Sequence, residues 1–163
     1  MAAYGMLVSL AFIFSYIEAV IPIPIPVPGV KLGLANLVTI VGLYTVGVKG
    51  TVAVSLIRIV LVGCTFGNLF SMVYGLAGGA LSLLLMILFR RTKWFSQVGI
   101  SIIGGIGHNV GQLTVAALVT ETAGVFYYLP FLLVAGTVAG AVIGLLGGLV
   151  TERIRKYVGK SMP

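Results

Sequence analysis

The sequence contains very little charge. Only 8% of its 163 residues are charged and aspartate is absent, whereas a soluble domain carries about 25% charged residues. Hydrophobic residues make up 60% of the chain, and its mean hydropathy is +1.20. A chain with so few polar side chains cannot cover its surface in water. We therefore exclude a soluble domain and predict a multi-pass protein of the cell membrane.

The shortage of acidic and metal-binding residues also restricts the chemistry. Glu18, Glu121 and Glu152 are the only acidic residues and lie far apart, so the acidic pairs that hold magnesium and a diphosphate are missing. His108 is the only histidine and has no second histidine or cysteine at ligand spacing, which argues against a zinc site. The single cysteine, Cys64, excludes an intrachain disulfide. We expect no metal, no cofactor and no enzymatic activity.

The cations are more numerous than the acids, and their placement is informative. The net charge is +7. Eight of the ten cations stand in three clusters between or after apolar runs: Lys49; Arg90, Arg91 and Lys93; Arg153, Arg155, Lys156 and Lys160. Such clusters are typical of the cytoplasmic loops of membrane proteins and not of a nucleic-acid-binding groove. We therefore expect both termini in the cytoplasm and no nucleic-acid partner.

Six apolar runs approach or exceed the length that crosses a bilayer, which is about 20 residues. They cover residues 3–21, 32–48, 50–67, 68–89, 97–120 and 126–150. The predicted fold is all-α, a single transmembrane domain over 1–163 with about six spanning helices. The break at 64–68 contains no charge, so five spans with one re-entrant piece are the alternative.

Two sequence patterns concern proline and glycine. Prolines alternate with apolar residues over 22–28, which requires an extended outer connector and suits a lid over a pocket. The start of the chain has no basic leader or cleavage motif, so we expect no removable signal peptide.

In the last run, glycines recur every four residues and predict a face for close helix packing. These glycines are Gly136, Gly140, Gly144 and Gly148.

Polar residues within the apolar runs are candidates for a binding site, because polar groups are costly in a bilayer and usually face the bundle interior. Arg58 lies within the third run, and the fifth contains three polar residues in close succession. Alternatively, Arg58 pairs with Glu18 or with carbonyls, and His108 is a satisfied donor between helices. Glu18 has Lys31 as a second possible partner. The candidate solute-binding residues are Lys31, Asn36, Arg58, Asn68, Ser71, His108, Asn109 and Gln112.

Three stretches of sequence resemble a known family. They are PGVKLGLANLVTIVGLY at 28–44, GNLFSMVYGLAGGALSLLLM at 67–86 and GGIGHNVGQLTVAAL at 104–118. The chain resembles the Gx transporters, a family also labelled heptaprenyl diphosphate synthase component I. That family is similar to the substrate-binding subunits of energy-coupling-factor transporters, which are six-helix proteins.

The resemblance implies a solute-uptake function. In such transporters the small subunit captures a vitamin-like solute near the outer face, and a transmembrane coupling subunit and two ATPase subunits supply the motion. The coupling subunit meets small residues of an alanine-rich motif on the first helix, and here Ala11 and Ser15 form a pair of small residues four apart. The sequence contains no complete phosphate loop, so energy must come from partners or an ion gradient.

Three functions from different classes therefore remain. The first is the substrate-binding subunit of a transporter for a vitamin-like solute or cofactor precursor. The second is a non-catalytic membrane partner of a polyprenyl diphosphate synthase, since the missing aspartates leave no site for the synthase reaction itself. The third is a stand-alone small carrier or channel. Only Thr51 and Ser55 lie between Arg58 and the cytoplasmic end of the third run, which favours binding over conduction.

Overall fold

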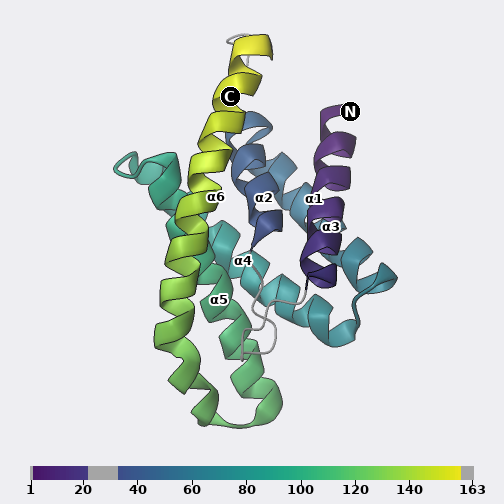
Figure 1. The fold of residues 1–163 in the computed structure, drawn as a ribbon, viewed down its shortest axis with the longest axis vertical. Coiled ribbons are helices and arrows are strands. Elements are labelled where there is room, and N and C mark those ends of the chain that lie inside the picture. The colour runs from purple at the N-terminus through teal and green to yellow at the C-terminus, as the bar shows by residue number, and fades with distance from the viewer. Residues whose placement is uncertain (1, 22–32, 159–163) are drawn as a thin grey trace.

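The computed structural model describes residues 2–21 and 33–158 and is all-α, as predicted. Six helices alternate in direction along one bundle (Figure 1). They are α1 (Ala2–Val20), α2 (Leu34–Thr45), α3 (Gly47–Thr65), α4 (Leu69–Thr92), α5 (Gln97–Thr120) and α6 (Leu129–Val158). A short 3-10 helix, η1 (Ala123–Tyr128), precedes α6.

Five of these helices are long and apolar enough to cross a membrane, and α2 is shorter, with 12 residues. At the uncharged break at 64–68, the chain turns back between α3 and α4. Helix α3 ends where the Phe66 N–H donates to Val62 O at 3.2 Å, and α4 begins after the N-cap residue Asn68. Both flanking helices have spanning length, so nothing at this break requires a re-entrant piece.

The cations of the clusters that fall within residues 2–21 and 33–158 lie at one end of the bundle. The start of α1 and the end of α6 lie together at that end in Figure 1, with the α2–α3 turn and the end of α4. There Arg90 donates from Nη1 to Leu43 O at 2.5 Å and lies 4.7 Å from the centre of the Tyr44 ring. Arg90 thus ties the last turn of α4 to the last turn of α2. The positive-inside rule predicts that this end faces the cytoplasm.

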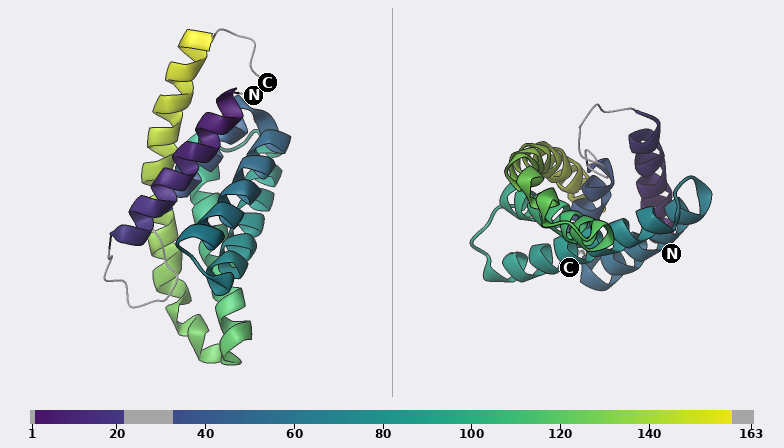
Figure 2. Two further views of the ribbon diagram at one scale, coloured as in Figure 1. Left: turned by 90° about the vertical axis from the view of Figure 1, so that its right-hand side faces the viewer. Right: turned by 90° about the horizontal axis from the view of Figure 1, so that it is seen from below.

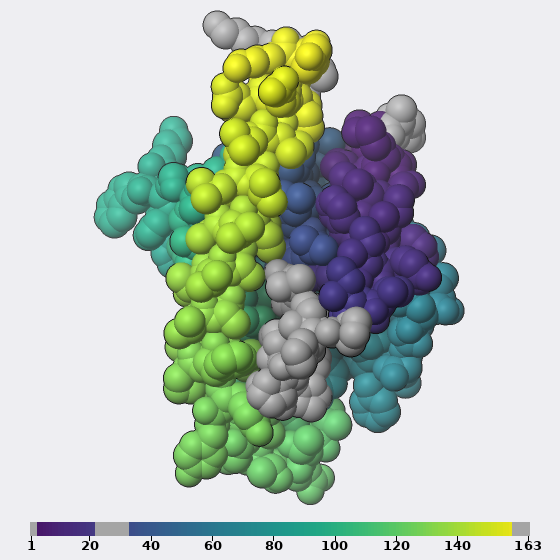
Figure 3. All heavy atoms as spheres, in the orientation of Figure 1, coloured from purple at the N-terminus to yellow at the C-terminus, as the bar shows by residue number. Residues whose placement is uncertain are grey.

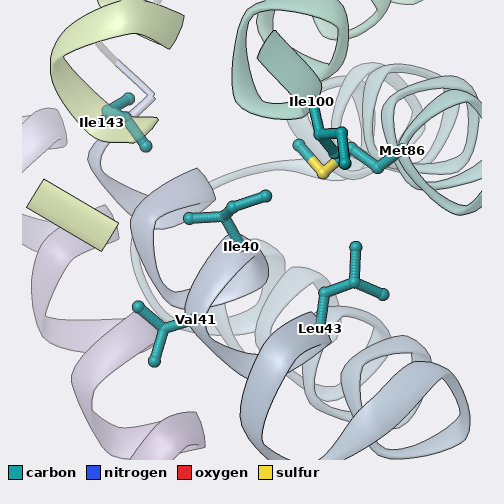
Figure 4. Packing of buried hydrophobic residues seen from close by; sticks show 6 residues of the cluster. All are labelled: Ile40, Val41, Leu43, Met86, Ile100 and Ile143. Carbon is teal, nitrogen blue, oxygen red and sulfur yellow. The ribbon is translucent and has the colours of Figure 1, made fainter. Parts of the chain in front are cut away.

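Helix α2 lies at the centre of the bundle. It packs against α1, α3, α5 and α6, and nine of its twelve residues are buried. Ile40 and Leu43 are completely buried. In Figure 4, Ile40 lies between Ile143 of α6 and the adjacent side chains of Met86 and Ile100. Because neighbours cover α2 on nearly every side, its length need not match that of a lipid-facing helix.

Most of the outer surface is apolar. Leu69 is 74% exposed and Leu118 72% exposed, and similar side chains project from the other long helices. Figure 3 shows the yellow end of α6 continuing beyond the rest of the bundle. An apolar surface of this extent requires lipid around it, so the chain is a multi-pass membrane protein.

Glycines bring α6 very close to α5. A Cβ atom on Gly140 would lie 2.6 Å from Ile102 Cα, and one on Gly144 would lie 2.7 Å from Val98 Cα. A Cβ atom on Gly136 would lie 3.1 Å from the carbonyl carbon of Gly105. A Cβ on the fourth glycine of the series, Gly148, would have no described atom within 4 Å. The close packing therefore involves three of the four predicted glycines.

The remaining packing residues lie inside this chain. Ala11 is 1% exposed and contacts Leu7, Val38 and Val54, while Ser15 is 3% exposed and donates to Ala11 O at 2.9 Å. Both side chains are therefore buried within the described part of this chain. The proline connector at 22–28 lies outside the described residues.

Candidate functional site

A cavity of about 350 Å³ lies where α1 and α3 face α4 and α5. Viewed from below (Figure 2, right), α1 lies to one side of the bundle and α5 and α6 lie to the other. Among the described residues, neither α1 nor α3 packs extensively on α5, and the cavity occupies this seam. Its lining residues are Ser15, Arg58, Ile59, Val62, Asn68, Phe70, Ser71, Tyr74, Gly75, His108 and Gln112.

The cavity is in the half of the bundle away from the cation clusters. Its walls come from the last turns of α1 and α3 and from the first turns of α4, and α5 contributes its central part. The positive-inside rule therefore predicts that the cavity lies in the outer half of the membrane. Five of the eight predicted binding residues line it: Arg58, Asn68, Ser71, His108 and Gln112.

Arg58 reaches the cavity from α3. Its Nε atom is buried and has no hydrogen-bond partner among the described residues. Glu18 of α1 is close enough to interact with it electrostatically. The Glu18 carboxylate also has a structural task, because its Oε1 accepts a hydrogen bond of 2.7 Å from the Leu34 N–H. Glu18 thus satisfies one of the free N–H groups at the start of α2, and its predicted partner Lys31 lies outside the described residues.

His108 and Gln112 lie one turn apart on α5 and are 9% and 8% exposed. A Cβ atom on Gly78 of α4 would lie 2.9 Å from Gln112 Cγ and 3.0 Å from His108 Cε1. On the other helix, a Cβ on Gly111 would lie 2.7 Å from Ala77 O. These two glycines let α4 and α5 touch through their backbones, and this contact fixes where the His108 and Gln112 side chains lie.

Gln112 has an unused hydrogen-bonding group. Its Oε1 is buried and has no hydrogen-bond partner among the described residues. A buried polar atom without a partner costs about 1–3 kcal/mol, and the cost persists in a membrane interior. A solute in the cavity would reduce this cost by donating to Gln112.

Asn68 and Ser71 line the cavity and also start α4. The Ser71 N–H donates to Asn68 Oδ1 at 2.8 Å, and the Asn68 N–H donates to Ser71 Oγ at 2.8 Å. This reciprocal pair is a capping box. The capping box uses Asn68 Oδ1 but not the side-chain nitrogen Nδ2. Asn68 would therefore contribute to solute binding through Nδ2.

The other three predicted residues do not line the cavity. Asn109 faces α6, where its Nδ2 donates to Leu132 O at 2.9 Å. Asn36 is buried in the first turn of α2 beside Gly33 and Ile143. Lys31 lies outside the described residues. His108 and Asn109 are sequence neighbours, but on a helix they point about 100° apart, which separates a cavity residue from a packing residue.

Other residues that line the cavity were not among the binding residues predicted from the sequence. Phe70 and Tyr74 line the cavity from α4 at a spacing of four residues, on the face that also carries Ser71. Ser15, which we assigned to packing, lines the cavity as well. Aromatic residues are common on lipid-facing helix surfaces, so this spacing alone did not separate a cavity wall from a lipid contact.

The lining of the cavity suits the binding of a small molecule. Within residues 2–21 and 33–158, no group of three or more His, Cys, Asp or Glu residues could hold a metal ion. The cavity combines one guanidinium, one imidazole, amide and hydroxyl groups and the rings of Phe70 and Tyr74. A few directed polar groups in a largely apolar enclosure are typical of small-molecule sites.

A family model described as heptaprenyl diphosphate synthase component I matches residues 7–150. No curated protein and no solved structure matches the chain.

Proposed function

Because the chain belongs to the heptaprenyl diphosphate synthase component I family and is a multi-pass membrane protein, we propose that it is the membrane-embedded binding subunit of a solute-uptake transporter. It captures a small molecule and catalyses no reaction. The observation that carries the proposal is the cavity in the outer half of the bundle, where Arg58, His108 and Gln112 come together.

The size and position of the cavity support capture from outside the cell. Its volume of about 350 Å³ falls in the range of small-molecule sites, which is roughly 300–1,000 Å³. The path from Arg58 toward the cytoplasm contains Thr51 and Ser55, which are 1% and 5% exposed. Thr51 donates to Gly47 O at 2.8 Å and packs against Gly42 of α2. A tightly packed inner half favours binding over free conduction.

Uptake through such a site requires partner subunits. In this proposal a transmembrane coupling subunit and ATPase subunits in the cell membrane supply the movement that releases the solute inside. The cavity is lined by α1 and α3 on one side and by α4 and α5 on the other. Movement of α1 and α3 against α4 and α5 would open or close the site.

The test uses the full-length chain in lipid nanodiscs, with native mass spectrometry to detect a small molecule that co-purifies. We expect a bound solute with the wild type and its loss with Gln112→Ala. The matched control is Thr114→Val, because Thr114 is exposed two residues further along α5 and its hydroxyl donates only to Val110 O. Equal solute binding by Gln112→Ala and Thr114→Val would contradict the site.

A second candidate function is a non-catalytic membrane partner of a polyprenyl diphosphate synthase. The family description names such a synthase. In addition, an apolar groove of about 260 Å³ runs between α3 and α4, with Ser55 as its only polar lining residue. This groove would suit a prenyl chain. Affinity purification separates the candidates, because a coupling subunit with ATPases supports the first and a soluble prenyl synthase supports the second.

A further inference from the structure

Two buried polar atoms on different helices determine what kind of solute the cavity accepts. Arg58 Nε on α3 and Gln112 Oε1 on α5 both lack hydrogen-bond partners among the described residues. One is a donor that carries positive charge and the other is an acceptor. A solute that satisfies both must therefore present an acceptor to one wall of the cavity and a donor to the other.

The group that faces Arg58 should be an anion. A guanidinium remains protonated in proteins and matches carboxylate and phosphate groups with its fork of donors. Glu18 lies close enough to interact with Arg58 electrostatically, but Arg58 Nε has no hydrogen-bond partner among the described residues. An anion at Arg58 would also offset the cost of a cation inside the membrane.

The aromatic and aliphatic lining residues indicate the shape and polarity of the rest of the solute. Phe70 and Tyr74 line the cavity from α4, and Ile59 and Val62 line it from α3. Aromatic side chains favour stacked or edge contacts with a flat ring. The volume of about 350 Å³ limits the body to a compact molecule.

We propose that the solute is a compact, ring-containing organic anion with an N–H or O–H donor at its other end. The anionic group binds Arg58, and the donor binds Gln112 Oε1. This assignment rests on the proposed function, because it names the class of solute that the same site captures.

The test measures thermal stabilisation and binding with full-length protein in phosphatidylcholine nanodiscs. The probes are a matched set: 4-aminobenzoate, 4-methylbenzoate, which lacks the donor, and 4-aminobenzamide, which lacks the charge. A second set carries a phosphate in place of the carboxylate and shows which anion is preferred. We expect the probe that carries both the amino group and the anionic group to bind best in one of the sets. Loss of the amino group or of the charge should weaken binding about 10- to 100-fold.

Variants assign each contact to its residue. Arg58→Gln should remove the preference for the anion over the neutral amide, and Arg58→Lys should restore part of it. Gln112→Met keeps the length of the side chain and should remove the preference for the amine over the methyl group. Thr114→Val is the matched control and should leave both preferences unchanged.

The outcomes separate this proposal from the proposed function. Equal binding of the three probes, no binding of either set, or an anion preference that survives Arg58→Gln would overturn the solute class. A co-purified solute that is lost in Gln112→Ala would still support the binding subunit in each of those cases. No co-purified solute and no probe binding would contradict both.

Discussion

Replacing Gly140 by alanine tests whether glycine spacing holds the bundle together. A Cβ at this position would lie 2.6 Å from Ile102 Cα and 2.9 Å from Ser101 O. Carbon atoms pack best at about 3.5–4.0 Å, so the backbones of α5 and α6 would have to separate by about 1 Å. Overpacking of this kind costs about 1–3 kcal/mol.

Gly148→Ala is the matched control for this experiment. It lies on the same helix in the same series of glycines, but its Cβ would meet no described atom within 4 Å. The gain in helix propensity from glycine to alanine, about 1 kcal/mol, is common to both variants and cancels in the comparison. Gly140→Ala should therefore be about 1–3 kcal/mol less stable than Gly148→Ala.

The measurement is unfolding in mixed micelles as the fraction of denaturing detergent increases, followed by circular dichroism. Gly140→Ala should unfold at a lower detergent fraction than Gly148→Ala. If the two variants unfold together, the close approach of α5 and α6 does not contribute to stability and the reasoning is wrong.

Further predictions concern residues next to the cavity. Asn109→Ala removes the donor to Leu132 O and should lower stability by about 1 kcal/mol with solute binding retained, which a combined melting and binding assay checks. Gly78→Ala displaces Gln112 and His108 and should weaken binding at least tenfold; unchanged affinity would show that the close contact does not position them. Glu18→Ala removes the acceptor for the Leu34 N–H and should cost about 1 kcal/mol in the same detergent titration, whereas Glu18→Gln keeps an acceptor and should lose less.

Hydropathy and charge predicted much of the fold. The run at 97–120 coincides with α5, and the all-α class with six helices is confirmed. The second run was predicted over 32–48, but α2 covers only Leu34–Thr45. Hydropathy reports how apolar a segment is, and it does so equally for a lipid-facing helix and for one buried by its neighbours. It therefore could not show that α2 is short and central.

The candidate site was predicted less completely, for a geometric reason. Polarity within the apolar runs indicated Arg58, His108 and Gln112, which the structure brings to one cavity. The same criterion also indicated Asn109, which bonds to α6. Whether a polar residue faces a cavity or a neighbouring helix depends on the rotation of its helix, and here that rotation follows from glycine contacts between helices. Sequence periodicity does not specify which pair of glycines will meet.

The contact between Gly78 and Gly111 has a consequence for divergence within the family. The two positions set the distance between α4 and α5 without touching the solute, whereas Arg58 and Gln112 lie where the solute would bind. Relatives that accept a different molecule should therefore change at 58 and 112 and keep small residues at 78 and 111. An exchange of solute would then need only a few substitutions, because the helix spacing that supports the cavity is inherited unchanged.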